Sequence, residues 1–208
     1  MASVSSWPDQ IRRSRPETGP WHYVDIPIDK PGLDMARDCP SGNCVIAAIA
    51  AMRAKLRDPA APADQRGEAL MFVIHFVGDM HQPLHSSNHG DRGGNEVHIV
   101  FHGQPGNLHG LWDGGLLARM GKEDDLFARL SAASARHRKK FAKGTVSDWA
   151  EQAHKLAQQV VYGKLPKAAP GAPVAIGADY ERRADAVIGL QIERAGARLA
   201  AVLNQDLQ

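Results

Sequence analysis

The sequence has few cysteines, few aromatic residues and no long apolar run. Two of its 208 residues are cysteines, and 6% are aromatic. It contains no stretch of about 18 or more consecutive apolar residues, so we expect no helix that spans a membrane. The first seven residues lack a basic segment followed by an apolar one, so we expect no secretory signal there.

A strong charge of either sign is also missing. The formal net charge is +2 with histidine neutral, which by itself does not indicate a polyanionic ligand. A length of 208 residues with 43% hydrophobic composition is sufficient to bury a core, and it predicts a single domain over residues 1–208. The composition does include ten histidines, and their positions carry most of the information.

The two cysteines, Cys39 and Cys44, flank a Pro-Ser-Gly segment. A turn in that segment would bring the thiols together, and a disulfide would fit an oxidising compartment. Two unpaired thiols in a cytosolic protein are the alternative.

The hydrophobic pattern is predominantly helical, and it predicts an all-α protein with at most one small β-hairpin. Alternating apolar residues predict a short strand at 96–101. The stretch 164–177, which contains proline and glycine, is predicted to be a loop. Helices are expected at residues 43–57, 68–81, 107–120, 122–142, 147–162 and 178–203, with Ser147 as a helix N-cap.

Two histidine–aspartate pairs stand out in these helices. His75 and Asp79 are four residues apart in a nearly all-apolar segment, so both side chains leave the same helix face. Burying two polar groups there costs free energy unless a partner satisfies them. His109 and Asp113 repeat the spacing, and His85 follows Pro83 between the two pairs.

A single pair of this kind is more often a salt-bridged histidine than a metal site. Two copies, with one in an apolar helix, favour metal binding. Zinc is the expected ion because it takes imidazole nitrogen and carboxylate oxygen ligands.

Longer motifs surround these pairs. The segment from His75 to His85 reads His-Phe-Val-Gly-Asp-Met-His-Gln-Pro-Leu-His, and it is followed by Gly93-Gly-Asn and by Asn107-Leu-His-Gly-Leu-Trp-Asp. Together with Trp7-Pro-Asp-Gln-Ile-Arg and Trp21-His-Tyr-Val-Asp, they resemble the zinc-dependent single-strand nucleases of fungi, plants and bacteria (the S-one/P-one type). The zinc phospholipases C are more distant relatives with the same helical fold.

The resemblance implies a set of metal ligands. One zinc would be bound by Asp9, His22, His75 and Asp79, and a second by His85, His109 and Asp113. Asp79 would also bridge to a third zinc close to the first. The resemblance likewise implies a disulfide between Cys39 and Cys44.

The resemblance also implies roles in catalysis and substrate binding. Asp9, Arg12 and Asp79 would be catalytic, with Arg12 on the scissile phosphate. Tyr23, Asp25 and Asn95 would surround the base next to the cut. The expected reaction is hydrolysis of single-stranded DNA or RNA to 5′-phosphorylated products by zinc-activated water, with a possible 3′-nucleotidase activity.

One family feature is not found in this sequence. Family members begin with a tryptophan whose terminal amine and carbonyl bind the third zinc, and a ligating histidine follows. We therefore expect two complete zinc sites here. An upstream start is the favoured explanation, because every other ligand is present, and a truncated gene product is the alternative.

Two competing functions remain at this stage: a phospholipase C-like phosphodiesterase, or a catalytically impaired zinc-binding remnant. The expected partners are single-stranded nucleic acid or nucleotides, with no membrane and no obligate protein partner, and a monomer is the family's default. The family is secreted or periplasmic.

Three other features were weighed. His81 is expected to be structural, and the sequence favours neither substrate contact nor its absence for Arg92. The basic run at residues 136–140 is interpreted as a solvated helix face rather than a nucleic-acid contact.

Overall fold

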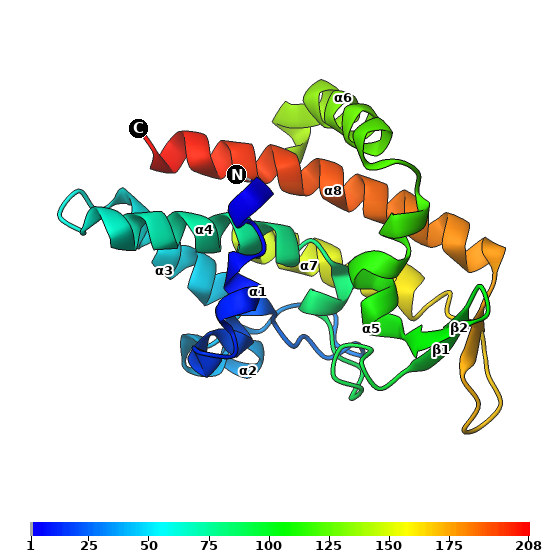
Figure 1. Cartoon of the computed structure of the whole chain (residues 1–208). Helices are drawn as coiled ribbons and strands as arrows, with labels where there is room; N and C mark the ends of the chain where they lie inside the picture. The colour runs from blue at the N-terminus through cyan, green and yellow to red at the C-terminus, as the bar shows by residue number, and fades with distance from the viewer. Residues whose placement is uncertain (1) are drawn as a thin grey trace.

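The computed structural model describes residues 2–208 and is mainly α-helical, as the sequence predicts (Figure 1). The principal helices are α1 (Trp7–Ile11), α2 (Met35–Asp38), α3 (Val45–Arg57), α4 (Ala63–Asp79), α5 (Leu108–Gly110), α6 (Glu123–Phe141), α7 (Val146–Leu156) and α8 (Ala178–Asp206). Short 3-10 or π-helical turns are η1 (Ala2–Val4), η2 (Pro16–His22), η3 (Pro40–Gly42), η4 (Pro83–Ser86), η5 (Leu111–Gly115), η6 (Leu117–Arg119) and η7 (Ala157–Val161).

Helix α4 lies at the centre of the first of two apolar clusters. Phe72, Val73, Phe76 and Val77 are fully buried, so this face of its second half packs in the core. Helix α3 packs along it, and α8 crosses the same core. The structure begins α4 at Ala63, five residues before the predicted start, because Pro62 ends the preceding turn and the first helical turns are polar.

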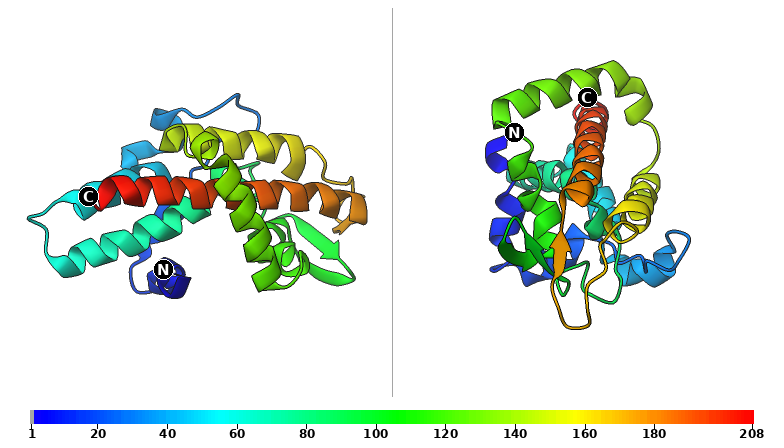
Figure 2. Two further views of the ribbon diagram at one scale, coloured as in Figure 1. Left: turned by 90° about the horizontal axis from the view of Figure 1, so that it is seen from above. Right: turned by 90° about the vertical axis from the view of Figure 1, so that its right-hand side faces the viewer.

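Helix α8 runs the length of the molecule with other helices on several sides. Figure 2 (right) views it nearly end-on, with α6 above it and α7 beside it. Its buried side chains contact both apolar clusters, through Val202 and Leu203 at one end and Tyr180 and Val187 at the other. Among residues 2–208, no helix is both long and apolar enough to cross a membrane.

The sheet is larger than predicted. Strands β1 (His98–Phe101) and β2 (Gln104–Asn107) form the expected antiparallel hairpin, and β3 (Val174–Ile176) pairs parallel to β1, giving the order β2-β1-β3. The prediction that residues 164–177 are entirely loop was therefore wrong at β3. Val174 and Ile176 face the second apolar cluster, and a run of three residues is too short to give a strand pattern.

The predicted helix at residues 107–120 is divided into three short pieces. It begins as α5, continues as the π-helical η5 and ends as the 3-10 turn η6. Glycines at 110, 114 and 115 lower helix propensity along this stretch, which explains why a regular α-helix does not form.

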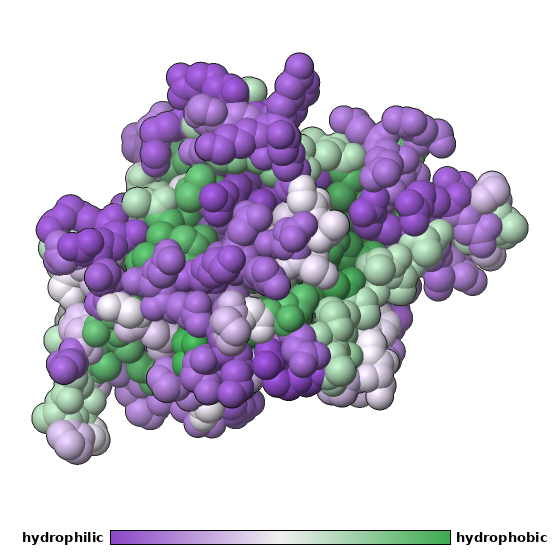
Figure 3. All heavy atoms as spheres, turned by 180° about the vertical axis from the view of Figure 1, so that it is seen from behind, coloured by the Kyte–Doolittle hydropathy of each residue, from purple (hydrophilic) through white to green (hydrophobic). Residues whose placement is uncertain are grey.

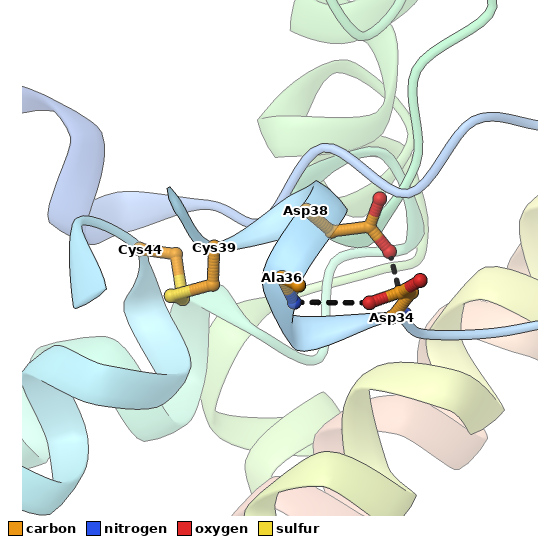
Figure 4. The surroundings of a disulfide bond; sticks show 5 residues. All are labelled: Asp34, Ala36, Asp38, Cys39 and Cys44. Atoms are coloured by element: carbon orange, nitrogen blue, oxygen red, sulfur yellow. Dashed lines mark hydrogen bonds between the residues drawn. A yellow bond between two sulfur atoms is a disulfide. The ribbon is translucent and has the colours of Figure 1, made fainter. Parts of the chain in front are cut away.

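A disulfide joins Cys39 and Cys44, as the resemblance implied. Figure 4 shows it between α2 and the start of α3, where Asp34 caps α2 by accepting a hydrogen bond from the backbone N–H of Ala36. Both cysteines are buried in the first apolar cluster. The bond therefore closes the turn between α2 and α3, and the first residue of α3, Val45, donates its backbone N–H to the Tyr23 carbonyl at 2.9 Å.

Candidate metal centre

Four side chains from three elements converge at the first candidate site. Asp9 comes from α1, His22 from the end of η2, and His75 and Asp79 from successive turns of α4. The carboxylate oxygen Oδ2 of Asp79 lies 2.8 Å from His22 Nδ1 and 2.9 Å from His75 Nε2. The Asp9 carboxylate lies 3.6 Å and 3.7 Å from the same two nitrogens.

The chemistry of this donor set fits a cation. His22 Nδ1 and His75 Nε2 are 3.0 Å apart, and both face two carboxylates. Both imidazoles are buried, whereas Asp9 is exposed at the mouth of the site. Two nitrogens and two carboxylate oxygens around one point match the ligand types and coordination number of zinc.

The outward nitrogen of His75 is also fixed. His75 Nδ1 donates a hydrogen bond to the backbone carbonyl of Ser5 at 2.6 Å. This bond selects the tautomer whose Nε2 lone pair points at His22 and Asp79. Such outward hydrogen bonds are typical of histidines that bind metals.

The second candidate site contains His85, His109 and Asp113. His85 lies in η4, His109 in α5 and Asp113 in η5. The Asp113 carboxylate lies 3.3 Å from His85 Nε2 and 3.2 Å from His109 Nε2, and the two rings stack with centroids 5.1 Å apart. One donor atom from each residue lies within 4.8 Å of the other two, which suits a single ion.

Two neighbours orient this second group. His109 Nδ1 donates to the backbone carbonyl of Gly93 at 2.8 Å, leaving its Nε2 free toward Asp113. The side-chain amide of Gln82 donates to Asp113 Oδ1 at 2.8 Å. Both candidate sites thus contain a histidine whose outward nitrogen is bound by a backbone carbonyl.

A glycine pair brings the loop close enough to make that contact. Gly93 and Gly94 have φ of 61° and 82°, the left-handed region that favours glycine. A Cβ at Gly93 would lie 3.0 Å from the Leu84 carbonyl, and one at Gly94 would lie 3.3 Å from the His109 nitrogen. Any larger residue would push the loop away from His109.

Asp79 lies between the two groups. Its Oδ2 faces His22 and His75, while its Oδ1 lies 3.7 Å from His85 Nδ1. Among residues 2–208, His85 Nδ1 and His22 Nε2 are buried nitrogens without a hydrogen-bond partner. Asp79 is therefore the residue that connects the two candidate sites.

The electrostatics favour ionised carboxylates in both groups. Burial opposes ionisation of Asp79, but hydrogen bonds from His22 and His75 outweigh it and hold the pKa of Asp79 well below its usual range. Burial likewise opposes ionisation of Asp113, and hydrogen bonds from His109 and His85 lower its pKa. Both aspartates are therefore ionised near neutral pH and can act as carboxylate ligands.

The four residues predicted to bind substrate line the same cleft. A cavity of about 750 Å³ contains Arg12, Tyr23, Asp25 and Asn95 together with His22, His85, His109 and Asp113. The Tyr23 ring is 38% exposed, so an aromatic face is available there. Desolvation raises the pKa of Asp25, although a hydrogen bond with Asn88 opposes the shift.

Backbone pairing holds the two sides of this cleft together. The N–H of Val24 donates to the His85 carbonyl at 2.8 Å, and the N–H of Asn88 donates to the Ile26 carbonyl at 2.9 Å. This pairing places the segment after His22 beside η4. It joins residues about sixty positions apart, which no local pattern could indicate.

The structure keeps His81 away from both groups, in line with the sequence expectation. His81 is buried, its Nδ1 donates to the Val77 carbonyl at 2.6 Å, and its Nε2 accepts from Arg198. Burial, together with the charge of Arg198, lowers the pKa of His81 to about 3, so it is neutral. His102 is on the surface, where it contacts Glu181.

Sequence reasoning missed several supporting residues. Gln82, Asn88 and the carbonyls of Ser5 and Gly93 contact predicted site residues. Arg92, left open from the sequence, lines the cleft with φ of 55°. The sequence offered one indication of a role for Gln82 and Asn88, since both are polar residues within a few positions of His85.

Comparison with known proteins shows which family the chain resembles. The family model described as S1/P1 Nuclease matches residues 1–208. The chain is 38% identical over 120 residues to Nuclease P1 of Penicillium citrinum, a match covering 54% of this chain and 43% of that protein.

Two further relatives match to a similar extent. The chain is 38% identical over 121 residues to Endonuclease 3 of Arabidopsis thaliana (54% of this chain, 41% of that protein) and 35% identical over 120 residues to Nuclease S1 of Aspergillus oryzae (54% and 40%). These matches span less than half the length of each relative. With the family model matching from end to end and residues of both histidine–aspartate groups lining one cleft, the chain belongs to the S1/P1 nuclease family.

Proposed function

We propose that this protein is a zinc-dependent endonuclease that hydrolyses phosphodiester bonds of single-stranded nucleic acid. The observation that carries the proposal is that residues of both histidine–aspartate groups line one cleft together with Arg12 and Tyr23. The relatives it matches are named nucleases and endonucleases, which supports the reaction class.

Two zinc ions would be bound by the described residues. Asp9, His22, His75 and Asp79 would bind one, and His85, His109 and Asp113 the other, with Asp79 placed to bridge to any further ion. When bound, zinc lowers the pKa of a water molecule toward about 7 and polarises a phosphoryl oxygen.

The chain's own residues would position the substrate. Arg12, whose guanidinium is within 3.6 Å of Asp9, would pair with the scissile phosphate and neutralise charge on its oxygens. The exposed Tyr23 ring would stack on a base, which requires an unpaired, unstacked nucleotide and so favours single strands. Asp25 and Asn95 would form hydrogen bonds with the edge of that base. The expected products carry 5′-phosphates.

The disulfide bears on where the protein acts. A bond between Cys39 and Cys44 persists in oxidising surroundings and is rare in the cytosol. We propose that the protein acts outside the cytoplasm.

The test combines metal content with cleavage. Elemental analysis should find two zinc ions per chain, and a chelator should abolish cleavage of a labelled single-stranded DNA. His109→Ala should lower the zinc content to one and stop cleavage, whereas His98→Ala, at the exposed first position of β1, should change neither.

Other outcomes would contradict the proposal. Hydrolysis of phosphatidylcholine without cleavage of DNA or RNA would indicate a phospholipase. Two bound zinc ions without any turnover on nucleic acid would indicate a catalytically impaired protein.

A further inference from the structure

A second cavity, of about 690 Å³, lies between α6, α7 and α8. It shares no residue with the metal cleft. Five cationic side chains line it: Lys140, Lys143, Lys155, Arg194 and Arg198. Figure 3 shows the molecule from behind, where hydrophilic residues dominate the surface and apolar residues occupy small areas between them.

Neighbouring carboxylates compensate only part of the positive charge of this cavity. Asp148 and Glu151 also line it, so cations outnumber carboxylates on its walls. Asp148 accepts hydrogen bonds from the backbone N–H and hydroxyl of Thr145, at 2.7 Å and 2.9 Å, and its charge also acts on Arg198. Within residues 2–208, none of the five cations forms a salt bridge with a carboxylate.

Arg198 is the most constrained of the five. It is 2% exposed, and its three hydrogen bonds go to neutral groups: the Phe141 carbonyl, the Gln152 side chain and the ring of His81. Burial lowers the pKa of Arg198 to about 10, so it remains charged at neutral pH. The Trp149 ring, whose centroid is 5.0 Å from the guanidinium, and the charge of Asp148 stabilise this cation in part. A buried cation without a salt bridge is costly, and an anion bound in the cavity would stabilise it further.

Helix dipoles explain only part of the arrangement. Lys140 and Lys155 lie in the last turns of α6 and α7, where cations stabilise a helix end. Arg194 and Arg198 lie in the interior of α8, and Lys143 lies beyond the end of α6. Cations on three helices therefore converge on one cavity for a reason other than helix stability.

We propose that this cavity is an exosite that binds backbone phosphates of single-stranded nucleic acid outside the metal cleft. Lysine and arginine are the usual partners of phosphate oxygens, and a concave site with charges on its walls suits a strand rather than a flat membrane. The identity of the ligand rests on the proposed nuclease function; the cavity and its charge do not.

The test is a charge-reversal variant of three exposed lysines, Lys140→Glu/Lys143→Glu/Lys155→Glu. Its matched control is Lys55→Glu/Lys164→Glu/Lys167→Glu, which changes the net charge equally at exposed positions outside the cavity. Binding of a labelled 30-nucleotide single-stranded DNA is measured by anisotropy in chelator, so that no cleavage occurs, over a series of salt concentrations.

The cavity variant should bind about tenfold more weakly or worse, and its salt slope should fall by about 2, since each phosphate contact contributes about 0.7. It should also raise KM for long substrates while leaving cleavage of a dinucleotide unchanged. The control variant should show much smaller effects on both.

Equal losses of binding in the cavity and control variants would overturn the inference, as would unchanged binding in the cavity variant. Binding of wild-type protein to anionic phospholipid vesicles, lost in the cavity variant while DNA binding persists, would overturn it in favour of a lipid surface. These outcomes are independent of catalysis. A protein that binds DNA through the cavity but never cleaves it would refute only the proposed function.

Discussion

At the scale of single residues, hydrogen bonds orient the histidines of the two candidate metal groups. His75 and His109 each donate their outward nitrogen to a backbone carbonyl, of Ser5 and Gly93 respectively. Each bond fixes one tautomer and one ring orientation. The Nε2 atoms of His75 and His109 then face Asp79 and Asp113, respectively, one helical turn away.

Gln82 gives a direct test of this support. Its amide donates to Asp113, and its carbonyl accepts from the backbone N–H of Leu84, so it connects the second group to η4. Gln82→Ala should weaken zinc binding at that site by about 10–100-fold, as is usual when a hydrogen bond to a metal ligand is removed. Competition with a zinc-sensitive dye measures the affinity. An unchanged affinity would show that Asp113 needs no such partner.

Tyr180 links stability to pH. Its hydroxyl donates to the Val161 carbonyl and accepts from Trp112. Burial raises the pKa of Tyr180 well above its usual value, outweighing the opposing effect of the Trp112 hydrogen bond. A raised pKa means that the folded state keeps a proton that the unfolded state loses. We therefore expect stability to be fully present below about pH 10 and to fall as the pH rises further.

Denaturant titrations from pH 8 to 11 check this expectation. Tyr180→Phe should make the alkaline decline shallower, and it should cost about 1–3 kcal/mol at neutral pH because two buried groups lose their partner. Some decline should remain, since burial also raises the pKa of Tyr162. The same pH slope in Tyr180→Phe and wild type would exclude Tyr180 as its source.

At the scale of elements, the start of α7 differs from the prediction. The sequence favoured Ser147 as its N-cap, but Thr145 occupies that position and forms a capping box with Asp148. The hydroxyl of Thr145 accepts from the Asp148 backbone, and the Asp148 carboxylate accepts from the Thr145 backbone. The prediction was wrong because a threonine followed three residues later by an acid satisfies two free N–H groups at once.

The two candidate caps can be compared directly. Thr145→Ala should lower the free energy of unfolding by about 1 kcal/mol, because it removes the cap. Ser147→Ala, within the first turn, should change it by less than about 0.5 kcal/mol. Urea denaturation measures both. A larger effect at Ser147 would contradict the assignment of the cap.

At the scale of the whole molecule, an ion pair joins α3 to the last turn of α8. Arg53 Nε lies 2.6 Å from the carboxylate of Asp206, which is completely buried, although the two residues are 153 positions apart. Arg57 approaches the same carboxylate at 3.6 Å but is half exposed. The pair fixes the end of α8 against the first apolar cluster.

Arg53→Met should destabilise the protein by about 3 kcal/mol or more, because it leaves a buried carboxylate without its closest partner. Arg57→Met, the matched control, should cost less than about 1 kcal/mol. Adding Asp206→Leu to Arg53→Met should recover much of the loss, since no buried charge then remains. Thermal and urea denaturation of the wild type and the three variants decides this, and a double variant no more stable than Arg53→Met would refute it.

Particular residues show how far prediction from the sequence reaches. The pairs His75–Asp79 and His109–Asp113 were visible because helical spacing puts positions i and i+4 on one face. His22, Asp9 and the substrate residues depended on longer motifs, since they join the site through chain contacts without local periodicity. The third strand and the π-helical turn η5 were missed, because a segment of three to five residues gives no pattern of its own.

The sequence by itself determined most of the helices and the residue types in each candidate metal group, and its motifs indicated the disulfide. These properties depend on residue spacing and side-chain chemistry, which are local. Only the tertiary structure placed Asp79 between the two groups, brought the Gly93 carbonyl to His109 and assembled five cations around one cavity. Each of those arrangements depends on packing between segments far apart in the chain, and its geometry exists only once the core has formed.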